Sequence, residues 1–236
     1  MKGLLKKDFY YILHSKALFL IMLLAGIASM FLTYINPNFS AGFVNGYIVV
    51  VCSLLTANSI ACDQENNGMV YLMSLAISRK TYINSKYILA LLTSFFGGVL
   101  VTLIFIALSF ISGKGPYPIV SDSPIAMSQY ILQLILVHIG FTSLALIFNS
   151  IAIPSLLKYD SKKGIWVTLA GFLAIATVIL LTVKIVTSSS FNLEILIGSS
   201  NKRDILYLAS ICALVSAIIM IISYGLSQKI MRAKEF

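Results

Sequence analysis

Six long, uninterrupted apolar runs constrain the fold of this chain more than any other feature. They span residues 17–34, 43–62, 87–111, 127–153, 165–186 and 205–226. About 20 apolar residues in a helix cross the hydrocarbon layer of a bilayer, whereas a membrane barrel would show short alternating segments instead. The sequence therefore predicts an all-α, polytopic membrane protein with six transmembrane helices, forming a single transmembrane domain over residues 1–236.

The composition supports a bilayer rather than water as the solvent. Hydrophobic residues make up 59% of the 236 residues and charged residues only 11%, whereas about 25% of the residues in soluble domains are charged. So few charged residues could not cover a water-soluble domain of this size. No small-residue cleavage site follows the first run, so we expect it to be a membrane span and not a cleaved signal peptide.

The basic residues predict the orientation of the spans. Six spans place the two termini and two of the loops on one side of the membrane and the other three loops on the opposite side. Of the 17 Lys and Arg residues, 13 lie in the four segments on the first side, and 4 lie on the opposite side or near it. Short loops rich in Lys and Arg stay in the cytoplasm. We therefore predict cytoplasmic termini and cytoplasmic loops at 63–86 and 154–164. Because the net charge of +9 is spread over these segments, nucleic-acid binding is not expected.

The N-terminal segment 1–16 is predicted to form an interfacial helix. Leu5, Phe9, Ile12 and Leu13 fall at i, i+4, i+7 and i+8, which is the spacing of one helical face. Such a helix can lie flat on the cytoplasmic surface of a bilayer. The sequence leaves open whether it only anchors the first span or also docks a partner.

The spans lack the residues that intramembrane chemistry requires. All eight Asp and Glu residues lie in loops or at span ends, and only His138 sits well inside a span. A proton relay, an intramembrane protease or a selectivity filter would need more than this, so we expect His138 to make an interhelical hydrogen bond. The segment SGKGPY lacks the first glycine and the hydroxyl residue of a phosphate-binding loop. We expect no catalytic activity, cofactor or metal in this chain.

The longest polar interruption, CDQENNGMVYLMSLAISRKTYINSK, still carries apolar residues at helical spacing. Met69, Leu72, Met73 and Ala76 fall at i, i+3, i+4 and i+7 after a turn-prone Asn-Asn-Gly, and Ser78 can cap a following helix. This pattern predicts a short amphipathic helix beneath the membrane, joined to the second and third spans. A partner that gripped such a helix would move both spans together.

Both cytoplasmic loops resemble those of the ABC-2 type transporter permeases. In that family an acidic residue and a glycine precede a leucine-rich coupling helix, followed by a Ser-Arg pair and a lysine. The corresponding residues here are Glu65, Gly68, Leu72, Leu75, Ser78, Arg79 and Lys86. The proline, basic-aromatic and Lys-Gly arrangement of the second loop is represented by Pro154, Lys158, Tyr159, Lys163 and Gly164. The sequence departs from the family pattern at Ala76, where proline is frequent, and at Asp160, where glycine is common.

The resemblance implies the transmembrane half of an ATP-driven exporter in a bacterial cytoplasmic membrane. ATP and Mg²⁺ would be bound by a separate ATP-binding subunit on the cytoplasmic side, and a second permease chain, identical or related, would complete the path through the lipid. The residues implied to contact the ATP-binding subunit are Asp63, Glu65, Gly68, Met69, Leu72, Met73, Ser78, Arg79, Lys158 and Tyr159. Charge reversal at Asp63 and Glu65 is then expected to abolish export without preventing membrane insertion.

The cargo is predicted from the lack of charge inside the spans. An apolar or amphipathic substrate is favoured over a sugar or an ion. Small permeases of this kind resemble exporters of amphipathic peptides such as bacteriocins and phenol-soluble modulins, so peptide export is the leading hypothesis. The alternatives are a lipid or drug exporter, a non-transporting membrane scaffold and a toxin-immunity protein, and the last two would need no ATPase.

Overall fold

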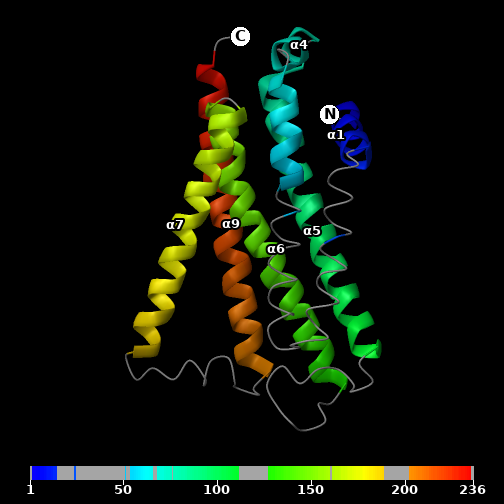
Figure 1. Cartoon of the computed structure of the whole chain (residues 1–236), viewed down its shortest axis with the longest axis vertical. Coiled ribbons are helices and arrows are strands. Elements are labelled where there is room, and N and C mark those ends of the chain that lie inside the picture. The colour runs from blue at the N-terminus through cyan, green and yellow to red at the C-terminus, as the bar shows by residue number, and fades with distance from the viewer. Residues whose placement is uncertain are drawn as a thin grey trace.

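The computed structural model describes residues 2–14, 24, 51, 54–65, 68–75, 77–111, 127–159, 161–188 and 202–234, and all regular secondary structure within them is helical, as predicted. The helices are α1 (Lys2–His14), α4 (Gly68–Ser74), α5 (Arg79–Ile111), α6 (Met127–Lys158), α7 (Ser161–Ser188) and α9 (Lys202–Ala233). Residues 54–64 form a further helical segment. Figure 1 shows the four long helices as a bundle, with α1, α4 and the last turn of α9 at one end. We call this the α4 end.

The last four predicted spans lie inside the four long helices α5, α6, α7 and α9. Among the residues described, two stretches are long and apolar enough to cross a membrane, namely His138–Lys158 of α6 and Ser210–Ala233 of α9. The first predicted span lies outside the described residues except at position 24, and the second is described at 51 and from residue 54 onwards. The count of six spans and their orientation stay predictions.

Helix α6 is the centre of the bundle, since α5, α7 and α9 all pack against it. Among the residues whose burial the structure describes, the buried apolar core includes Ile60, Tyr82, Ile83, Phe148, Leu156, Leu157 and Met231. Helix α7 approaches α6 closely where it carries a glycine: a Cβ on Gly164 would lie 2.8 Å from Leu156 Cδ2 and 3.1 Å from Leu156 Cα. The Lys-Gly element of the second loop therefore has a packing function.

A proline inside α6 leaves a backbone carbonyl for a neighbouring helix. Pro154 has no N–H to donate to the carbonyl of Ser150 four residues earlier. The hydroxyl of Ser223 in α9 donates to this carbonyl instead, at 2.6 Å. Helix α6 consequently continues through Pro154 to Lys158, so the segment predicted as a loop at 154–164 is largely helical, with α7 beginning at Ser161.

The amphipathic helix predicted between the second and third spans is α4. Met69 is buried, and Leu72 and Met73 pack against the core, while Ala76 lies outside the described residues. As predicted, Ser78 caps the next helix: its Oγ accepts a hydrogen bond from the backbone N–H of Thr81 at 3.1 Å. Helix α5 therefore begins well before the predicted span at residue 87.

Candidate functional site

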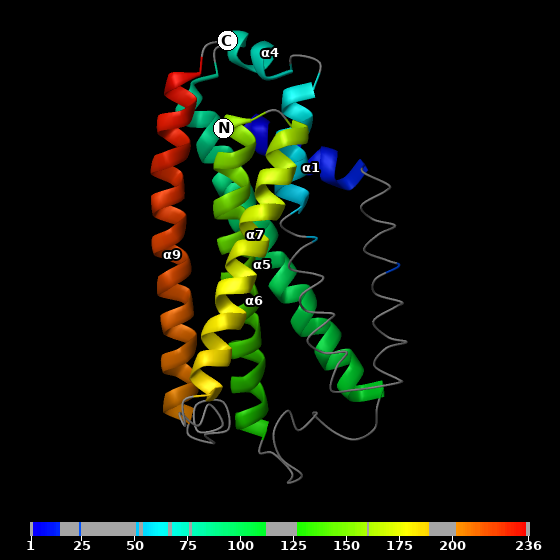
Figure 2. The same cartoon turned by 60° about the vertical axis from the view of Figure 1, so that its left-hand side comes forward.

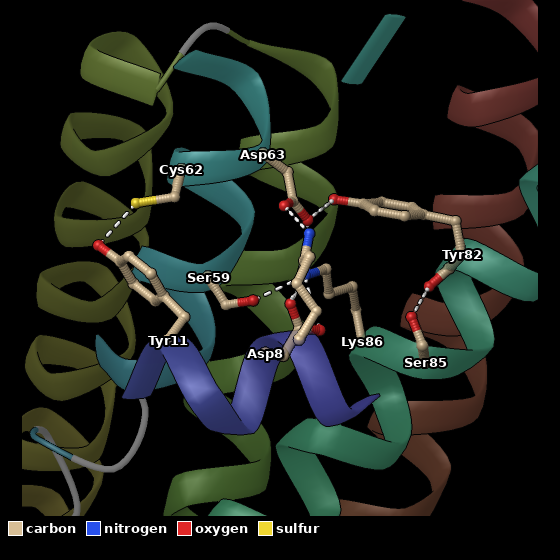
Figure 3. A network of polar contacts seen from close by, with 9 residues as sticks. Asp8, Tyr11, Ser59, Cys62, Asp63, Tyr82, Ser85 and Lys86 are labelled. Atoms are coloured by element: carbon tan, nitrogen blue, oxygen red, sulfur yellow. Dashed lines mark hydrogen bonds and ion pairs between the residues drawn. The ribbon is translucent and has the colours of Figure 1, made fainter. Parts of the chain in front are cut away.

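A buried cluster of charged side chains joins three parts of the chain at the α4 end. Lys86 of α5 has none of its surface exposed, and Asp8 of α1 and Asp63 are also buried. The Lys86 ammonium lies 2.9 Å from both carboxylate oxygens of Asp8, 2.7 Å from Asp63 Oδ2 and 2.6 Å from Ser59 Oγ. Figure 3 shows these side chains converging from different helices. A buried ammonium ion is tolerated only when it is paired and hydrogen-bonded in this way.

Two further side chains complete the cluster. Lys7, which is partly exposed, contacts the other carboxylate oxygen of Asp63 and lies 3.7 Å from Asp8 Oδ1. The phenol of Tyr82 donates a hydrogen bond to Asp63 Oδ2 at 3.0 Å. The two lysines balance the two aspartates, so the group is neutral as a whole. We call Lys7, Asp8, Asp63, Tyr82 and Lys86 the ion-pair cluster.

The electrostatics of the cluster keep Asp63 ionised. Burial on its own raises the pKa of Asp63, but the positive charges of Lys86 and Lys7, together with their hydrogen bonds, outweigh burial and hold the pKa below its usual value. The pKa of Tyr82 is raised well above its usual value, first by burial and then by the adjacent Asp63 carboxylate. Tyr82 is therefore a neutral hydrogen-bond donor to a charged acceptor.

The residues flanking α4 also hold the ends of two long helices. Gln64 Nε2 donates to the carbonyl of Leu156, and at 3.4 Å to that of Tyr159. Arg79 Nη1 donates to the carbonyls of Met231 and Arg232, at 3.1 and 2.9 Å. The last carbonyls of a helix lack partners within the helix, and a cation at this end is favoured by the helix dipole. We call the segment 63–79, which contains α4, the hub loop. Its Gln64 and Arg79 side chains thus bind the C-terminal ends of α6 and α9.

The outer face of α4 carries apolar side chains that this chain does not cover. Tyr71 is 65% exposed, and Val70 and Leu75, which directly follows α4, are about half exposed. Glu65, just before α4, is exposed as well. Exposed apolar side chains grouped in this way mark a surface for contact with another protein or with the membrane.

Comparison with known proteins identifies the family. The sequence matches the family described as ABC-2 family transporter protein over residues 3–232. The chain belongs to this family. No curated protein matches the sequence significantly. An ABC-2 permease is a membrane protein that works with an ATP-binding subunit, which is the coarse function that the loop motifs predicted.

The residues predicted to touch the ATP-binding subunit of this ABC-2 permease lie in two different environments. Asp63 and Met69 are buried within the chain, and Ser78 and Arg79 are engaged in capping. Gly68 follows Asp63 so closely that a Cβ on it would lie 2.9 Å from the Asp63 carbonyl oxygen. The others are partly or largely exposed, and they are Glu65, Leu72, Met73, Lys158 and Tyr159. Their contact with a partner stays a prediction.

Sequence patterns did not reveal the partners of Lys86 or the cap on the end of α6. Asp8 lies among lysines in a segment whose pattern is one of apolar spacing, and Gln64 belongs to no motif. A signal was present for Asp8, because it is the only acidic residue before the first span. Pairing it with Lys86, 78 positions later, requires the three-dimensional fold.

The permease also holds its long helices together through hydroxyl groups within the bundle. The Tyr87 hydroxyl lies 2.6 Å from Ser223 Oγ and 2.9 Å from Ser227 Oγ, which links α5 to α9. Asn149 Nδ2 donates to Ser94 Oγ at 3.3 Å, which links α6 to α5. Interhelical hydrogen bonds of this kind stabilise helix packing in lipid, where apolar contacts alone give little preference.

Figure 2 shows that α5 diverges from α9 away from the α4 end. Residues of α5, α6 and α9 line a cavity. Its volume is about 650 Å³, and its lining is mainly apolar, with Phe95, Leu146, Met220 and Ile221 among the residues that form it. His138 also lines it, and its ring lies edge-on to Phe95 with 5.5 Å between the ring centroids. The hydrogen bond expected of His138 stays a prediction.

Proposed function

We propose that this ABC-2 permease is the transmembrane subunit of an ATP-driven exporter that moves amphipathic or hydrophobic peptides out of a bacterial cell. A separate subunit would bind ATP and Mg²⁺ and hydrolyse ATP in the cytoplasm. One observation carries the proposal: the hub loop is bonded to α1, α5, α6 and α9 together, through the ion-pair cluster and the caps of Gln64 and Arg79.

These bonds make the hub loop suited to transmit force. A loop attached only through the backbone would move its two neighbouring helices and little else. Here a displacement of α4 pulls on Lys86 and Lys7 through Asp63, and on the ends of α6 and α9 through Gln64 and Arg79. Charged hydrogen bonds in buried surroundings resist separation more strongly than solvent-exposed ones.

The exposed face of α4 is the proposed contact with the ATP-binding subunit. Tyr71, Val70 and Leu75 offer an apolar surface there, and Glu65 adds a charge at its edge. Since Asp63 and Met69 point into the permease, they would support this surface from behind. Exposed tyrosines of this kind often supply a large share of the affinity of an interface.

The cavity between α5, α6 and α9 supports an apolar or amphipathic cargo. Its lining combines an extended apolar surface with a few hydroxyl groups and the imidazole of His138. Sites for amphipathic ligands are predominantly hydrophobic, with a small number of polar groups that fix orientation. A second permease chain, identical or related, would complete the path across the membrane.

Co-purification with candidate ATP-binding subunits, followed by ATP hydrolysis assays in nanodiscs, tests the proposal. We expect Tyr71→Asp to weaken the complex by about 30-fold or more, since interface hot spots contribute at least about 2 kcal/mol. Lys229→Asp is the control, because it also introduces an aspartate at an exposed position, on α9 and outside the proposed contact surface.

Retention of the subunit by the Lys229 variant and its loss by the Tyr71 variant would support the assignment. Equal binding by both variants would remove α4 from the interface. If no ATP-binding subunit co-purifies with the wild-type chain, a scaffold or immunity protein replaces the exporter as the best description. A complex whose ATP hydrolysis responds to lipids or drugs but not to amphipathic peptides would overturn the cargo.

A further inference from the structure

Helix α1 has one face that is bonded to the rest of the molecule. Leu4 and Asp8 are buried on this face, and Asp8 binds Lys86. One turn further on, the Tyr11 hydroxyl accepts a hydrogen bond from the Cys62 thiol at 2.8 Å. These contacts fix the rotation of α1 about its own axis and so determine which side chains point away from the bundle.

The opposite face of α1 carries two lysines and two aromatic residues. Lys2, Lys6, Phe9 and Tyr10 follow one another at i, i+4, i+7 and i+8, and all four are exposed. Phe9 keeps 44% of its surface exposed and Tyr10 keeps 63%. The His14 ring stacks on Tyr10 with 4.0 Å between centroids. The lysines occupy the first two turns of this face and the aromatic rings occupy the turns that lead to the first predicted span.

We propose that this face of α1 binds the headgroups of anionic phospholipids. The ammonium groups of Lys2 and Lys6 complement the phosphate charge, and each basic side chain near an anionic bilayer adds about fivefold to the affinity. Aromatic side chains prefer the headgroup level, where their rings meet apolar chains and their polar atoms meet water. Water alone would be a poor environment for Phe9 and Tyr10 placed side by side.

The position of α1 fits this partner. Figure 1 places α1 beside α5 at the α4 end, at the edge of the bundle. The exposed face therefore looks outwards at the level where the long helices leave the predicted spans. A protein partner of α4 would lie beyond that level, whereas lipid headgroups would lie beside it.

Lipid bound on one face of α1 would act on the ion-pair cluster through the other face. Asp8 and Lys7, which bind Lys86 and Asp63, lie on the same three turns as Lys2, Lys6 and Phe9. Anionic lipid that holds α1 in place therefore stabilises its ion pairs with α5 and the hub loop. The site stands independently of the cargo and of the ATP-binding subunit.

A single tryptophan reporter tests the site in the full-length chain alone. The sequence contains one tryptophan, the exposed Trp166 of α7. Tyr10→Trp combined with Trp166→Phe moves the only reporter to the proposed lipid face. Phosphatidylglycerol brominated on the acyl chain near the glycerol is titrated into the detergent-solubilised protein, with brominated phosphatidylcholine as the neutral lipid. We expect quenching by the anionic lipid at concentrations at least about tenfold lower, and weaker quenching at higher salt.

Lys2→Gln/Lys6→Gln in the reporter background should lower the affinity for the anionic lipid by about 25-fold, at about fivefold for each lysine. Lys162→Gln/Lys163→Gln is the matched control, since both of these lysines are exposed in the first turn of α7. Its quenching curve should match that of the parent. An unchanged thermal midpoint in both variants verifies that the ion-pair cluster is intact.

Equal quenching by both lipids, or an equal effect of the two double-lysine variants, would overturn the proposal. Absence of quenching by either lipid, together with a fluorescence change when the ATP-binding subunit is added, would assign this face to that protein instead. Because the lipid titration contains no ATP-binding subunit, its failure is distinct from failure of the exporter assignment.

Discussion

Replacing Lys86 by methionine tests whether the ion-pair cluster holds α1, α5 and the hub loop together. Methionine keeps most of the side-chain volume but removes the charge that lies within 2.9 Å of Asp8 and 2.7 Å of Asp63. Lys7, which is partly exposed, would then be the only cation left beside two buried carboxylates. Removing one partner of a buried ion pair costs about 3–5 kcal/mol. For a chain of this length this predicts a thermal midpoint lower by about 6–20 °C.

The assay is thermal unfolding of the purified protein in one detergent, followed by the loss of monodisperse protein on size exclusion. Lys86→Met/Asp8→Asn removes one positive and one negative charge, and it leaves the Lys7–Asp63 pair balanced. We expect this double variant to be about 2 kcal/mol more stable than the sum of the two single changes implies. Lys80→Met, at an exposed position in the same helix, is the control and should stay within about 0.5 kcal/mol of wild type. Equal midpoints for the Lys86 and Lys80 variants, or strict additivity in the double variant, would refute the cluster as the link between these elements.

Three further predictions concern single positions. Because the pKa of Asp63 is lowered on folding, its ionised form adds stability above its ordinary pKa of 3.8, and this is lost as the pH falls through the folded value. The difference in thermal midpoint between wild type and Asp63→Asn should therefore stay constant from about pH 7 to pH 5 and shrink below about pH 4. Ser223→Ala leaves the Ser150 carbonyl without the hydroxyl that replaces the missing N–H of the proline, and should cost about 1–3 kcal/mol in the same unfolding assay. Gly164→Ala should cost about 1–3 kcal/mol through overpacking against α6. Gly140→Ala, which places the added carbon where no neighbouring atom lies within 4 Å, should stabilise α6 by about 0.5–1 kcal/mol. A Gly140 variant less stable than the Gly164 variant would contradict this packing.

The apolar spacing in the sequence was enough to predict the four long helices and the inner face of α4. Met69, Leu72 and Met73 are turned towards the core because their positions share one side of a helix. The cap at Ser78 was predictable for the same reason, since it depends on residues only three apart. Local rules succeed where the interacting atoms are neighbours in the chain.

The ion-pair cluster could not be predicted in this way. The resemblance to the ABC-2 permeases implied that Asp63 contacts the ATP-binding subunit. The structure surrounds Asp63 with Lys7, Tyr82 and Lys86. Lys7 lies 56 positions earlier in the chain and reaches Asp63 only when α1 packs beside α5. Charge reversal at Asp63 should therefore disrupt the fold, whereas reversal at the exposed Glu65 tests the partner contact alone.

The cluster also explains why ion pairs, and not apolar contacts alone, hold α1 against α5, although apolar packing would serve for stability. Apolar side chains between α1 and α5 would allow α1 to slide by a turn, because one leucine contact resembles the next. Lys86 accepts only the arrangement in which Asp8 and Asp63 reach it together, so the pairs specify one register. Asp63 lies between Lys7 of α1 and Tyr82 of α5, and it is adjacent to Gln64, which holds the end of α6. A pull from lipid on α1 and a push from an ATP-binding subunit on α4 would thus meet at the same carboxylate, and neither could move its helix without changing the contacts of the other.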